Sequence, residues 1–81
     1  MPKVRISMQD LQRRALAEVR NQPGCHGVRE IAINRVAKPA ESNWSLCVLE
    51  AGSADANTAA RAAVYVQTVL RRDYDLADGL I

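Results

Sequence analysis

The sequence predicts a small α+β domain in the order helix, strand, strand, helix. Residues 8–20 and the stretch after residue 55 repeat their apolar side chains with the helical period, whereas residues 28–37 and 44–50 alternate as strands do. Glycine, proline and short polar residues separate these segments. We expect both helices to pack on one face of an antiparallel β-hairpin, because the apolar face of the hairpin must be covered.

The first helix has a clear beginning and end. Ser7 is a good N-cap, and Asp10 three residues later approximates a capping box. The sequence NQPG at 21–24 ends the helix, because the residue before a proline is pushed out of the α region. The residues predicted to form the buried stripe of this helix are Met8, Leu11, Ala15, Leu16 and Val19.

The two strands differ in their patterning. In residues 28–37, Ile31 and Ile33 alternate with polar or small residues, which is typical of a half-buried strand. KPAESN at 38–43 is a break. In residues 44–50, Trp44, Leu46 and Val48 form one apolar face, and Trp44 is expected in the core. The opposite face contains Cys47 and Leu49, which is more apolar than a fully solvated face and favours a strand that is central in its sheet or covered on both sides.

The second helix is predicted to span about 16 to 19 residues, because neither glycine nor proline interrupts the chain between Gly52 and Gly79. Ser53 and Asp55 are its candidate N-caps. Its apolar stripe is rich in alanine, which allows a close approach to a neighbouring element. The residues of this stripe are Ala59, Ala62, Ala63, Val66, Val69 and Leu70.

Two strands alone make a marginal sheet, so the sheet should be extended. We favour extension by the hairpin of a second subunit. The alternative uses KVRI at 3–6 and the C-terminal tail as strands, which gives a ferredoxin-like βαββαβ order. Residues 1–81 are expected to form a single domain, with 1–5 and 77–81 as flexible tails.

Length and composition narrow the class of protein. The N-terminus has no apolar run typical of a signal peptide, and no segment approaches the roughly 20 apolar residues that span a bilayer. We therefore expect a soluble cytoplasmic protein that does not bind membranes. The net charge is only +2, but residues 1–38 carry eight basic and three acidic residues, whereas residues 39–81 carry three basic and six acidic ones. This asymmetry predicts charge complementarity within the protein or between subunits.

The sequence QPGCHGV at 22–28 places a cysteine beside the only histidine. Neighbouring side chains in a turn usually point in different directions, and a cysteine nucleophile needs a base within hydrogen-bonding distance. The spacing of Cys25, His26 and Cys47 matches no zinc motif. We therefore predict a turn and no enzyme, metal site or cofactor. Both cysteines should be reduced packing residues.

Nucleic-acid binding is the alternative function. Arg13 and Arg20 are seven residues apart on the outer face of the first helix, and Arg29 precedes the first strand, so these side chains are candidates for contacting phosphates. The order of elements resembles that of double-stranded RNA-binding domains, which run helix, three strands, helix. Two departures are that the chain has two clear strands and that SADANTAAR replaces the lysine-rich start of the second helix.

The function that the sequence favours is a small noncatalytic interaction module, with homodimerisation as one form of that interaction. The hairpin edge and the alanine-rich helix face are its two candidate contact surfaces. We expect a protein partner or self-association, and the RNA- or DNA-binding module that would use Arg13, Arg20 and Arg29 remains open.

Overall fold

The structure is a computed structural model that describes residues 3–36 and 44–76. Within these ranges it contains two helices and four strands, which confirms the predicted mixture of helical and strand structure. In chain order the elements are β1 (Val4–Ile6), α1 (Met8–Arg20), β2 (Glu30–Arg35), β3 (Trp44–Glu50), α2 (Ala56–Asp73) and β4 (Tyr74–Leu76).

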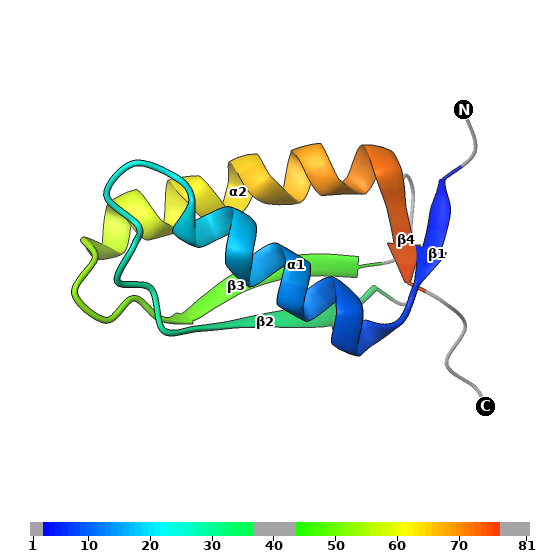
Figure 1. Ribbon diagram of the computed structural model, residues 1–81, viewed down its shortest axis with the longest axis horizontal. Coiled ribbons are helices and arrows are strands. Elements are labelled where there is room, and N and C mark those ends of the chain that lie inside the picture. The colour runs from blue at the N-terminus through cyan, green and yellow to red at the C-terminus, as the bar shows by residue number, and fades with distance from the viewer. Residues whose placement is uncertain (1–2, 37–43, 77–81) are drawn as a thin grey trace.

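The strands β2 and β3 pair antiparallel, with Ile33 opposite Leu46. α1 packs against β2, α2 packs against β3, and the two helices also contact each other. Both helices lie on one side of the hairpin, so the domain has one helical layer and one layer of β2 and β3 (Figure 1). On the opposite face of the hairpin Cys47 and Leu49 are exposed. Among the described residues β3 pairs with β2 alone and is covered on one face, so it is neither central nor covered on both faces as the sequence led us to expect.

α1 begins and ends where the sequence predicts. The Ser7 hydroxyl accepts a hydrogen bond from the backbone N–H of Asp10 at 3.1 Å, which satisfies one of the free donors of the first turn. Leu11, Ala15 and Val19 are fully buried, whereas the other two residues of the predicted stripe are partly buried at its margins. The helical period alone thus identifies the face that joins the core.

α2 is capped by the second of its two candidates. One carboxylate oxygen of Asp55 accepts hydrogen bonds from the backbone N–H of Thr58 at 3.0 Å and from its hydroxyl at 3.2 Å. These bonds hold the pKa of the Asp55 carboxyl below its ordinary value of 3.8, because they stabilise the charged form. The alanine-rich stripe is buried along most of its length, and Val69 lies at its half-exposed margin.

The core lies between the helices and the inner face of the hairpin. Trp44 is its largest fully buried side chain, which confirms its predicted place. Its indole N–H donates a hydrogen bond to the backbone carbonyl of Tyr74 at 3.1 Å, so the polar group of the ring is not left unsatisfied. Through this bond the start of β3 is tied to the end of α2.

β1 and β4 form a short parallel pair at one end of the molecule, with Arg5 opposite Asp75 (Figure 1). The element order is therefore that of the ferredoxin-like alternative. Among the described residues, however, β1–β4 and β2–β3 are two separate two-stranded sheets and not one four-stranded sheet. Val4 and Arg5, expected in a flexible tail, belong to β1, whereas 77–81 lie outside the described residues.

Candidate interaction site along the outer edge of β3

The three arginines proposed for phosphate binding lie on different elements. Arg13 is in the middle of α1 and forms an ion pair with Asp10 at 3.4 Å. Arg20 is the last residue of α1, and its Nε donates a 2.7 Å hydrogen bond to the backbone carbonyl of Val28. Arg29 is exposed just before β2. Arg20 therefore fastens the end of α1 to the segment that enters β2, a role that the sequence does not reveal.

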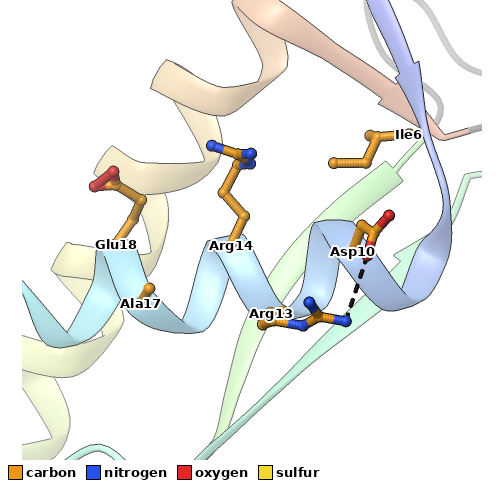
Figure 2. A pocket seen from close by; sticks show the side chains of 6 residues that line it. All are labelled: Ile6, Asp10, Arg13, Arg14, Ala17 and Glu18. Carbon is orange, nitrogen blue, oxygen red and sulfur yellow. Dashed lines mark ion pairs between the residues drawn. The ribbon is translucent and has the colours of Figure 1, made fainter.

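A shallow depression of about 400 Å³ runs along the outer side of α1. Figure 2 shows that Arg13 and Arg14 point in different directions and that Asp10 and Glu18 line the same depression. The Arg14 guanidinium lies over the ring of Tyr74, 5.2 Å from its centroid. Carboxylates beside the guanidinium groups oppose phosphate binding at this surface, since like charges repel.

The turn that contains Cys25 and His26 packs against the loop before α2. Cys25 is fully buried, with its thiol 3.9 Å from the carbonyl oxygen of Thr58, whereas His26 is exposed. A side chain at Gly27 would collide with Ser53, because the backbone of Gly27 lies directly against the Ser53 side chain. The two reactive side chains are in different environments, as expected of a turn. Cys47, expected to pack, is exposed.

Each helix donates or accepts hydrogen bonds at the backbone of the strand beneath it. From α1, the Gln12 side-chain amide donates to the Ile31 carbonyl at 3.3 Å. From α2, the Gln67 side-chain oxygen accepts from the Leu46 N–H at 2.7 Å. The Arg71 guanidinium donates to the Trp44 carbonyl with Nε at 3.1 Å and an Nη at 2.7 Å. These bonds satisfy backbone groups that no neighbouring strand reaches.

The outer edge of β3 therefore has a closed half and an open half. The closed half comprises the Trp44 carbonyl and the Leu46 N–H, which Arg71 and Gln67 occupy. Backbone groups point to the same side at every second residue of a strand, so the Leu46 carbonyl and both backbone groups of Val48 also point away from β2. These three groups form the open half, since no side chain or turn among the described residues bonds to them.

A groove of about 420 Å³ lies beside the open half, between β3 and the first part of α2. None of its lining residues is charged. Leu49 and Val64 at its margins are exposed by 58% and 62%, so the groove continues into an exposed apolar surface. The complete lining is Leu46, Cys47, Val48, Leu49, Ala51, Ala56, Ala60, Ala63 and Val64.

The sequence names the hairpin edge and the alanine-rich face of the second helix as candidate contact surfaces, but not the groove. The structure buries most of that helix face in the core, so it is not a free contact surface. Ala56, Ala60 and Val64 recur at four-residue intervals, which places them on one side of α2 next to the buried stripe. That second apolar row was a usable signal. The hydrogen bonds of Gln67 and Arg71 had no such signal, because they depend on how α2 lies over β3.

Comparisons with protein-family models, curated proteins and solved structures found no match to this chain. Within the described residues, none of the helices is long and apolar enough to cross a membrane. The same residues contain no group of three or more side chains suited to hold a metal ion.

Proposed function

We propose that this protein is a small noncatalytic interaction module that binds an extended polypeptide segment along the outer edge of β3. The observation that carries the proposal is the juxtaposition of open backbone groups at Leu46 and Val48 with an uncharged apolar groove. An added strand takes its affinity from main-chain hydrogen bonds and its specificity from pockets for alternate side chains. The β3 edge offers the main-chain hydrogen bonds, and the groove offers a place for apolar side chains.

The composition of the groove supports this form of binding. Alanine residues on α2 leave space above the edge, and a segment with apolar side chains on one face would remove Leu49 and Val64 from water. The expectation that the module is noncatalytic is consistent with Cys25 and His26, whose side chains occupy buried and exposed environments respectively.

The test is a titration with synthetic heptapeptides of alternating valine and threonine, followed by amide chemical shifts. With the peptide in large excess, the shifts should move at Leu46, Val48 and Leu49 and on the adjacent side of α2. A control peptide that is N-methylated at alternate positions keeps its side chains but lacks the donors of one edge. It should bind at least about tenfold more weakly, since it forfeits main-chain hydrogen bonds. Absence of shifts at the β3 edge with every peptide would refute the proposal.

A further inference from the structure

We propose that the segment bound at this edge is β3 of a second copy of the same chain, paired antiparallel about a two-fold axis at Val48. This inference rests on the proposed function, because it names the occupant of the same edge. The resulting dimer would join two hairpins into one four-stranded antiparallel sheet with α2 of each copy above the junction. A two-stranded sheet is marginal alone, so this assembly also supplies the missing strands.

The two open backbone groups of Val48 are complementary to themselves. In this register the Val48 N–H of each copy donates to the Val48 carbonyl of the other, forming the reciprocal pair of hydrogen bonds typical of antiparallel strands. The pairing leaves Gln67 in place on the Leu46 N–H. The pairing is confined to Val48 and the residues beside it, because Gln67 covers the Leu46 N–H and the register shift between Glu30 and Ile31 makes Leu49 an extra residue on β3.

Charge complementarity is the argument for a second copy as occupant. One end of the hairpin has Glu30 opposite Glu50, with Arg29 beside them. The other end has Arg35 opposite Trp44, whose carbonyl is held by Arg71. Antiparallel pairing brings Glu50 of one copy toward the end of β3 where Arg71 of the other copy bonds to the Trp44 carbonyl.

The two-fold axis makes that charge pairing occur twice. In the Val48 register, Glu50 of one copy lies just beyond the paired Val48 residues, on the side where Arg71 of the other copy contacts the Trp44 carbonyl. Parallel pairing of two copies would instead bring like ends together and would be opposed by repulsion. The groove itself contributes no opposing charge, because its lining is uncharged. An isologous dimer of this kind uses the same patch on both subunits.

The first experiment measures mass by light scattering on a sizing column across micromolar concentrations. The wild-type protein should be a dimer. Val64→Glu places a charge in the groove and should weaken the dimer at least about tenfold, as expected for a residue inside an interface. The matched control is Tyr65→Glu, because Tyr65 neighbours Val64 on α2 and is equally exposed at 59% but does not line the groove. It should change the dissociation constant less than about twofold.

The second experiment tests the register by disulfide formation. Pairing about Val48 places Cys47 of one copy opposite position 49 of the other, with Cβ atoms about 5 Å apart, whereas Cys47 and its own counterpart are diagonal at about 7–8 Å. A mixture of wild-type protein with the Cys47→Ser, Leu49→Cys variant should therefore cross-link under mild oxidation. Neither protein should cross-link alone at a comparable rate, and Cys25 is buried in both.

The outcomes separate the two proposals. A monomer at every concentration, or a dimer that Val64→Glu leaves intact and that forms no mixed disulfide, overturns the second-copy inference. If the heptapeptides still shift the β3 edge in that case, the proposed function stands with another occupant. If the peptides also leave the edge unchanged, both proposals are wrong. A dimer weakened by Val64→Glu, with a mixed disulfide between positions 47 and 49, supports both.

Discussion

The outer edges of β2 and β3 both accept hydrogen-bonding side chains from a helix, but part of the β3 edge remains open. Each receives a glutamine and an arginine from the helix above it. On the β2 side, Gln12 bonds to the Ile31 carbonyl and Arg20 to the Val28 carbonyl. On the β3 side, Gln67 and Arg71 bond to the first part of the strand. Long polar side chains on a helix thus take the place of a neighbouring strand.

The difference lies in the side chains above the rest of β3. Ala56, Ala60 and Ala63 end in a methyl group and cannot bond to the strand backbone as Gln67 and Arg71 do, so the backbone at Val48 remains open and a groove lies beside it. The length of a few α2 side chains therefore decides where the edge is closed and where it can accept another strand.

The largest loss of folding stability should come from replacing Gln67, and the matched change at Gln12 should cost much less. Gln67→Met leaves the Leu46 N–H without its acceptor in a nearly buried position, which should cost about 1–3 kcal/mol. Gln12→Met removes a longer bond from an exposed side chain and should cost less than about 0.5 kcal/mol. Urea unfolding of both variants measures the difference. Equal losses would show that the two edges are braced equally and would break the comparison.

A smaller, pH-dependent effect on folding stability should come from the N-cap of α2, the helix whose alanine residues line the groove. The folded-state pKa of Asp55 is lowered mainly by the backbone and hydroxyl donors of Thr58. Its contribution to stability is therefore complete above the unfolded pKa and is lost as the pH falls through the lower folded value. Thermal unfolding from pH 6 downward should show this loss in the wild type.

Two variants sharpen that measurement. Asp55→Asn keeps an N-cap acceptor without a titrating charge, so this position should no longer contribute to the acid-induced loss. Asp55→Ala should be less stable than the wild type at neutral pH and should lose less on acidification. An identical acid profile for all three proteins would contradict a role for the Asp55 charge.

The smallest effect is expected at the exposed arginines. The combined change Arg13→Gln and Arg29→Gln should leave the free energy of unfolding within about 0.5 kcal/mol of wild type, since both side chains are on the surface.

Mobility shifts with RNA and DNA at low salt test the alternative function in the same variant. Binding that falls steeply with salt and disappears in the variant would favour the nucleic-acid module and turn attention from the β3 edge to α1.

The local elements of this protein could be predicted from its amino-acid pattern. The bounds of α1, its cap at Ser7 and the inward position of Trp44 follow from periodicity and from short-range hydrogen bonds, whereas the sequence left the cap of α2 open between Ser53 and Asp55. The turn around Cys25 follows equally from its glycine and proline residues. Other features depend on contacts between residues that are far apart in the chain.

The parallel β1–β4 pair, the exposure of Cys47 and the open half of the β3 edge were settled by how distant segments pack. Arg71 illustrates the difference. Its position in the last turn of α2 is favourable for the helix dipole, as the sequence indicates, but its bond to the Trp44 carbonyl spans 27 residues. No local pattern encodes such a contact, because it exists only after α2 has been placed over β3.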